Sequence, residues 1–282
     1  MIGIAKTIKL FIGGEFPRTE SGRSFKVMFH QSNKVYANLC LSSRKDFRTA
    51  VEASEKGHKD WFSKTAFNRS QILYRMAEMM EGKRLEFVSL FELCLGMKSQ
   101  QANLEVDKAI ESFVYFSGFC DKYMQLLSNL NPINGPFANF SAPEPMGIVV
   151  LFANNNFNFG NLIANICSVI SGGNSLILLM DQEHPCPALL SPLAETLATS
   201  DLPGGVVNIL TGSIAEILPY VGSHMSVRSI SFQDSNLENL HKIKELSVMN
   251  LKRVIPLRHN PLSLEAISDT LEIKTTWQPM GF

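Results

Sequence analysis

The stretch from Glu144 to Pro185, EPMGIVVLFANNNFNFGNLIANICSVISGGNSLILLMDQEHP, decides the fold. Its first part, Met146 to Ala153, is a nearly unbroken apolar run, which is typical of a strand covered on both faces. Apolar residues then recur at helical spacing until Gly172-Gly173, which predicts a helix closed by a left-handed glycine. Ser175 to Met180 predicts a second buried strand, so the whole stretch predicts a βαβ unit.

The loop after the first predicted strand lacks the glycine-rich pattern that cradles phosphate in many βαβ units. Three asparagines, Asn154 to Asn156, stand there instead. Because one βαβ scaffold serves many unrelated activities, the fold alone assigns no chemistry. Function has to be argued from particular residues.

Composition excludes several classes of function. The chain has 282 residues, of which 45% are hydrophobic and 18% charged, as expected for one large or two modest globular domains. Its formal net charge is zero, so neither nucleic acid nor an anionic membrane is predicted to bind. A low net charge does permit association with another protein.

Five scattered cysteines without a CxxC pair argue against a disulfide framework and against a metal site. They favour a reducing compartment, which predicts a cytoplasmic protein. We identify no signal peptide at the N-terminus and no apolar stretch long enough to span a bilayer.

The first 143 residues are predicted to be mainly helical. Gly13-Gly14 predicts a hairpin turn, with a return strand over 24–29. Apolar periodicity predicts helices over 42–64, 68–95 and 102–130, with Gly82 as a possible break in the second. Segment 131–143, NPINGPFANFSAP, is predicted to be a linker or an exposed hairpin.

The second half alternates strands and helices. Further strands are predicted over 206–210, 227–232 and 251–257. The predicted fold class is therefore α/β, with an open, five-stranded, mostly parallel, Rossmann-like sheet. We divide the chain into a helical segment (1–143), a cofactor-binding-type domain (144–260) and a short tail (261–282).

Several segments together resemble the aldehyde dehydrogenase superfamily. EPMGIV resembles the family's EPxGVV strand, and DLPGGVVNILTG (201–212) resembles GLPPGVVNVVTG. KLFIGGEFPRTESGRSFKV and EVDKAIESFVYFSGFCDKY are similar to its opening hairpin and to a helix before the linker. The resemblance covers residues 8–270 and implies oxidation of aldehydes with NAD or NADP, through a cysteine thiolate, a glutamate base and an oxyanion hole.

Carried over residue by residue, the resemblance implies a degenerate site. The family's PWNFP falls on 154–158, so the oxyanion asparagine is Asn156 and its tryptophan neighbour is Asn155. A simple helix-capping loop is an equal alternative for 154–158. The family's KPxE, which binds the adenosine ribose, becomes LMDQ, with Leu179 at the lysine and Gln182 at the glutamate.

The remaining family positions are also altered. FTGST becomes FQDSN, with Asp234 at the phosphate glycine and Ser235 beside it, and we interpret Asp234 as a cap in the anion site. LELGG becomes PLRHN, which puts Leu257 at the general base, with His259 nearby. No cysteine matches the nucleophile segment, and Cys120 and Cys167 are predicted to be inert core residues.

These replacements predict that no cofactor is bound, with NAD or NADP as the ligand if the site is retained. Three hypotheses stay open: a catalytically dead protein that associates with itself or with a full-length relative, the cofactor half of a split enzyme, or a decayed gene product. The resemblance also implies that segment 131–143 is an oligomerisation hairpin whose C-terminal partner strand is missing.

Overall fold

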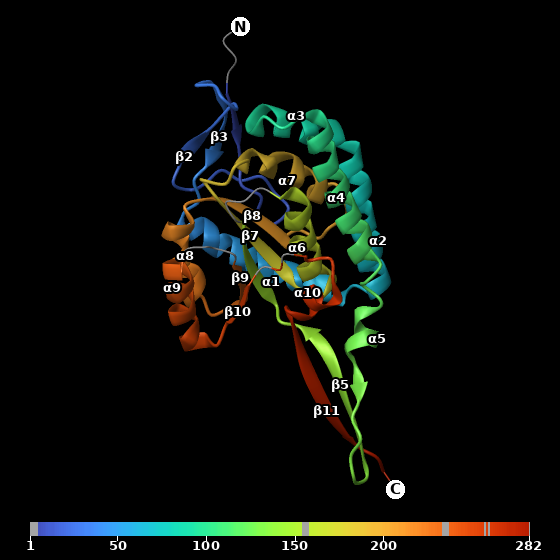
Figure 1. The fold of residues 1–282 in the computed structure, drawn as a ribbon. Helices are drawn as coiled ribbons and strands as arrows, with labels where there is room; N and C mark the ends of the chain where they lie inside the picture. Colours follow the sequence, from blue (N-terminus) through green and yellow to red (C-terminus); the bar gives the residue numbers. More distant parts are fainter. Residues whose placement is uncertain (1–4, 154–157, 233–236, 257, 259, 282) are drawn as a thin grey trace.

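The computed structural model describes residues 5–153, 158–232, 237–256, 258 and 260–281. It consists of a layered α/β body from which a thin β arm projects, with the C-terminus near the tip of the arm (Figure 1). The described helices and 3₁₀ turns are α1 (Arg44–Ser63), α2 (Ala66–Gly82), α3 (Arg84–Leu95), α4 (Ser99–Ser117), α5 (Tyr123–Leu127), α6 (Phe159–Ser171), η1 (Pro187–Leu189), α7 (Leu190–Ala198), α8 (Ile214–Ser223), α9 (Leu237–Ser247), η2 (Val248–Asn250) and α10 (Leu264–Ser268).

The body is built on the predicted parallel sheet. Its strands are β6 (Ile148–Ala153), β7 (Ser175–Asp181), β8 (Val207–Gly212), β9 (Val227–Phe232) and β10 (Arg253–Pro256), in the order β10-β9-β6-β7-β8. All four described pairings are parallel, so the predicted fold class is confirmed. The chain leaves the central strand β6 in one direction and returns on its other side through β9, which creates a topological switch point between these two strands.

Alternate side chains of each strand enter two separate cores, because successive residues of a strand point to opposite faces. Val149 and Leu151 of β6 join a core with helices α2, α3, α4, α6 and α7. Val150 and Phe152 join a second core with α1, α8 and α9. Two covered faces explain why β6 and β7 read as continuous apolar runs.

The helical predictions were right in kind and inexact in extent. A capping box at Ser43 starts α1, in agreement with one of the two predicted caps. The predicted helix 68–95 forms two helices, α2 and α3, and the break between them lies at Gly82-Lys83, where Gly82 predicted it. The predicted helix 102–130 ends at Ser117, and α5 follows after a turn.

The N-terminal strands differ from the prediction. Gly13-Gly14 does form a turn, with positive φ at both glycines and a bridge between Ile12 and Glu15. The strand β2 (Ser24–Met28), however, pairs with β3 (Val35–Cys40) and not with the Gly13-Gly14 hairpin, and β1 (Lys6–Ile8) lies on the other side of β3. Phe11 instead bridges Ile209 of β8, which attaches the hairpin to the main sheet.

The arm corrects the expectation of a missing partner strand. Strand β5 (Phe137–Pro145) pairs with the two-residue β4 (Asn129–Leu130) and, along its full length, with β11 (Leu271–Pro279). Residues 261–282, predicted to be a short tail, therefore contain α10 and the strand that completes the arm. Leu271, Ile273 and Trp277 alternate with polar residues, which is a strand pattern that the sequence analysis missed, but the partner of this strand lies 130 residues away and only the fold identifies it.

Candidate functional site at the carboxyl edge of the sheet

Open α/β sheets bind ligands outside the carboxyl ends of their strands, at the switch point. Here that point lies between β6 and β9, and the segments that follow these strands are 154–157 and 233–236. Asn155, Asn156, Asp234 and Ser235 fall in those segments and lie outside the described residues, as do Leu257 and His259. Their predicted roles stay predictions.

Leu179 lies within the described part of the site. It is the fifth residue of β7 and is 2% exposed, in the core that β7 shares with α1 and α8. A buried aliphatic side chain offers a ribose neither a hydrogen bond nor a charge. This position contributes packing to the body.

Asp181, at the end of β7, caps the N-terminus of α8. Its Oδ2 accepts from the Ile214 N–H at 2.9 Å, and its Oδ1 accepts from the Glu183 N–H at 2.8 Å. A carboxylate at a helix N-terminus is stabilised by the free N–H groups and by the helix dipole. The start of α8 is thus already occupied by an anion from the chain itself.

Gln182 follows Asp181 and keeps an exposed side chain. Its backbone N–H donates to the Gly212 carbonyl at 2.9 Å, which ties the end of β7 to the end of β8. The amide side chain is the one described family position that still offers hydrogen-bonding groups to a ligand.

The N-terminus of α6 is also capped by side-chain acceptors. Asn158 is its N-cap and accepts from the Asn161 N–H at 2.9 Å. Glu105 of α4 accepts from the Phe159 N–H at 2.9 Å and forms an ion pair with Lys108. The capping alternative for segment 154–158 is therefore confirmed at its last residue.

The described residues show no metal centre, and the two cysteines predicted to be inert are buried. No group of three or more His, Cys, Asp or Glu side chains is arranged to hold a metal among them. All five cysteines are free and buried. Burial raises the pKa of Cys120 to about 12 and raises the pKa of Cys167 well above its ordinary value, as expected for inert core thiols. None of the described helices has the length and apolar character that crossing a membrane requires.

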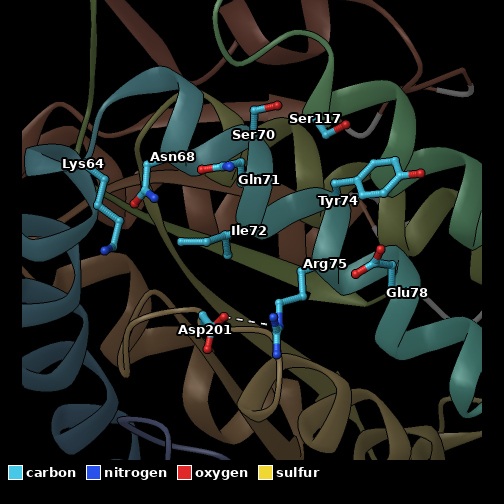
Figure 2. Close-up of a pocket in the computed structure, with 10 residues that line it drawn as sticks. All are labelled: Lys64, Asn68, Ser70, Gln71, Ile72, Tyr74, Arg75, Glu78, Ser117 and Asp201. Carbon is cyan, nitrogen blue, oxygen red and sulfur yellow. Dashed lines mark ion pairs between the residues drawn. The ribbon is translucent and has the colours of Figure 1, made fainter.

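A second concave region lies along α2, away from the switch point, and has a volume of about 620 Å³. Figure 2 shows Arg75 of α2 directed toward Asp201, with which it forms an ion pair of 3.2 Å. Neither Leu179 nor Gln182, the predicted site residues within the described part of the chain, lines this groove. Its lining is polar and of mixed charge: Lys64, Asn68, Ser70, Gln71, Ile72, Tyr74, Arg75, Glu78, Ser117 and Asp201.

The order of the sheet, its covered faces and its switch point define the doubly wound class of nucleotide-binding folds. The chain belongs to the aldehyde dehydrogenase family, whose model matches residues 16–256. It is 28% identical over 253 residues to the cytosolic 10-formyltetrahydrofolate dehydrogenase of Pongo abelii, covering 87% of this chain and 28% of that protein. The human mitochondrial 10-formyltetrahydrofolate dehydrogenase is 26% identical over 251 residues, covering 86% and 27%.

Solved structures agree on the fold. An NAD⁺ complex of an aldehyde dehydrogenase from Bacillus cereus superposes with a TM-score of 0.82 at 24% identity, covering 89% of this chain and 50% of that one. This chain therefore spans about half the length of that solved enzyme. The bound NAD⁺ belongs to that enzyme. It does not show that this chain binds NAD⁺.

Sequence reasoning missed Asp181 and Glu105. Asp181 is the variable residue of the segment that corresponds to KPxE, but its hydrogen-bond partner Ile214 lies 33 positions away. Glu105 lies 54 positions from Phe159. A search for carboxylates opposite predicted helix starts would include both residues, yet only the fold selects them.

Proposed function

We propose that this chain is a non-catalytic member of the aldehyde dehydrogenase family that acts by associating with another subunit, either a second copy or a full-length relative. The arm formed by β4, β5 and β11 carries the proposal, because it projects from the body and presents apolar side chains. The burial of Leu179 and the capping of α8 by Asp181 support the part of the proposal that concerns the lack of catalysis.

One face of the arm is suited to contact a partner. Opposite residues of paired strands share a face, so the register places Phe137, Ile273 and Trp277 on the same side. Ile273 is 57% exposed and Trp277 is 60% exposed. Phe137 and Trp277 pack edge to face with ring centroids 6.1 Å apart, which makes a preformed aromatic contact surface.

The arm also presents an open strand edge. In the order β11-β5-β4, β11 has a single described neighbour, so the outer backbone groups of a nine-residue strand are free to pair. Polar cross-strand contacts, including Ser141 to Thr275 at 2.8 Å and the ion pair of Lys274 with Glu144, hold this edge in register. A strand of a second subunit is the natural complement to such an edge.

The association is tested by measuring the mass of the purified chain in solution, alone and mixed with a full-length family member. We expect a stable complex with a copy or with the relative, and we expect Trp277→Asp together with Ile273→Asp to abolish it. Leu85→Asp is the control, since Leu85 is also an exposed apolar residue, at 83%, but lies on α3. A wild-type chain that stays monomeric and binds no relative would refute the proposal.

The non-catalytic part has its own test. Titration calorimetry with NAD and with NADP should show no micromolar binding, because Leu179 is buried and Asp181 already closes α8. Micromolar affinity for either dinucleotide would refute it. Binding by Leu179→Lys alone, without such binding by the wild type, would locate the loss at this one position.

The cofactor half of a split oxidoreductase is the second candidate. It is favoured by an intact switch point and by a family match that ends at Pro256, the last residue of β10. Mixed with a separate catalytic chain, this protein would then support NAD-dependent aldehyde oxidation. Asn156→Ala should lower that rate by about 10²–10³, the usual cost of removing one oxyanion donor, and unchanged activity would exclude this candidate.

A further inference from the structure

A cavity of about 330 Å³ lies at the opposite end of the sheet from the family's cofactor edge. Its wall is the C-terminal half of α1, and its floor is the backbone that enters β6 and β9. The lining residues are Glu55, His58, Lys59, Met146, Gly147, Ile148, Ser226 and Arg228. Neither the resemblance nor the proposed function gives a role to the side chains of Glu55, His58, Lys59 and Arg228.

The charges around this cavity are left unpaired by the protein itself. Glu55, Lys59 and Arg228 line one space, yet every ion pair that the structure describes involves other residues. Gly147 has φ +119, and a Cβ built on it would lie 3.5 Å from Arg228 Cγ, so the arginine stem lies across this glycine. A side chain there would be strained by its φ, and its Cβ would lie in van der Waals contact with the arginine stem.

Positive charge is concentrated behind Arg228. Lys252 is 7% exposed and donates from Nζ to the His224 carbonyl at 2.5 Å. Burial, followed by repulsion from Arg228, lowers the pKa of Lys252 to about 8. A cation kept near a second cation without a carboxylate partner is stabilised when an anion binds beside them.

His58 supplies the opposite kind of group. Its Nδ1 lies 3.1 Å from the Gly173 carbonyl, which can only accept, so Nδ1 carries the proton. Burial lowers the pKa of His58, which keeps the ring neutral with Nε2 as an acceptor. The ring stacks on Phe62 at 6.1 Å, and this contact fixes its plane. His58 Nε2 and the Glu55 carboxylate can therefore both receive hydrogen bonds from a ligand.

We propose that this cavity binds a free amino acid with an acidic side chain. Arg228 and Lys59 hold its two carboxylates, and Glu55 with His58 holds its ammonium group. The volume lies within the range of small-molecule sites, and complementary charges at three points distinguish such a ligand from a simple anion. Because the site is partly open to water, we expect weak binding, with a Kd of about 1 mM.

Titration calorimetry of the full chain with L-glutamate tests the proposal, with two matched probes. Glutarate has both carboxylates without the ammonium group, and L-glutamine has a neutral side chain of the same size. We expect L-glutamate to bind at least tenfold more tightly than either. Glutarate binding as tightly as L-glutamate would overturn the assignment, as would the absence of any heat with L-glutamate.

Variants locate the site. Arg228→Gln and Glu55→Gln should each weaken L-glutamate binding at least tenfold, and circular dichroism should show that both variants stay folded. Arg48→Gln is the control, because Arg48 lies on the same helix but outside the cavity, where it pairs with Glu52. Equal binding by all three variants would overturn the proposal.

Discussion

The two tryptophans of this protein lie in its two contrasting regions. Trp61, on α1, is fully buried in the body and donates its ring N–H to the Ile170 carbonyl at 2.7 Å. Trp277, on β11, is 60% exposed on the arm. The same residue type thus holds the body together in one place and is presented to solvent in the other. The body is stabilised by burial, whereas the arm is stabilised by strand pairing.

The largest predicted effect is on the body. Trp61→Ala should destabilise the protein by about 3–5 kcal/mol, because it leaves a large cavity and removes the hydrogen bond from the indole N–H to the Ile170 carbonyl. Urea denaturation followed by circular dichroism measures this. Trp61→Phe is the milder control, and it should cost less because it keeps most of the apolar volume.

The body also predicts a pH dependence through His184. Burial lowers the pKa of His184 from 6.5 to about 4, and its Nδ1 accepts from the Cys186 N–H at 3.1 Å. The folded state disfavours the protonated imidazole of His184. The contribution of the neutral ring to the free energy of unfolding is therefore complete above pH 6.5 and is lost as the pH falls toward 4. The loss should reach about 3 kcal/mol at the lower end.

Urea denaturation at both ends of that pH range, for the wild type and for His184→Asn, isolates the histidine. The asparagine keeps an acceptor but cannot take up a proton near neutral pH, so its stability should fall less on acidification. An equal fall in both proteins would mean that His184 contributes nothing to the pH dependence.

A smaller effect is expected at the carboxyl edge of the sheet. Asp181→Ala should cost about 1 kcal/mol, because the first N–H of α8 loses its acceptor. Glu183→Ala, at an exposed neighbour in the same turn, is the control and should change stability by less than about 0.5 kcal/mol. If Asp181→Ala also allowed a dinucleotide to bind, the carboxylate would be shown to occlude a ligand position at the start of α8, which is separate from the phosphate position predicted at 233–236.

The smallest effect on folding is expected on the arm. Trp277→Ala should change the free energy of unfolding of the monomer by less than about 1 kcal/mol, since little of the ring is buried. The same variant should strongly weaken association if the arm is the contact surface. If Trp277→Ala lowered the free energy of unfolding as much as Trp61→Ala does, the arm would be stabilised by burial in the same way as the body, contrary to this prediction.

The sheet was predictable because its signal is local. Residues 148–153 and 176–180 are apolar at every position, and such runs indicate strands covered on both faces. The break at Gly82-Lys83 was indicated by the glycine, whereas the end of α4 at Ser117 was not predicted, since apolar residues continue beyond it. Strand β3 was missed, because VYANLC is short and only partly alternating.

Of the candidate site, the sequence predicted which family groups are replaced, and it did so without the fold. Leu179 could be identified as an inadequate ribose contact from its chemistry alone. That Asp181 caps α8, and that Glu105 caps α6, depends on pairs 33 and 54 residues apart. Contacts of that separation are fixed by packing of the whole body and leave no local pattern.

The sequence by itself determined the fold class and the family, and it predicted the loss of the family's ligand groups, because apolar runs and residue identities are local properties. The tertiary structure alone decided that β11 pairs with β5, that Trp61 is buried and that Trp277 is exposed. It also brought Glu55, His58 and Arg228 around one cavity. Those outcomes depend on which distant segments meet, and that choice is made by the packing of the two cores and by the register of the strands.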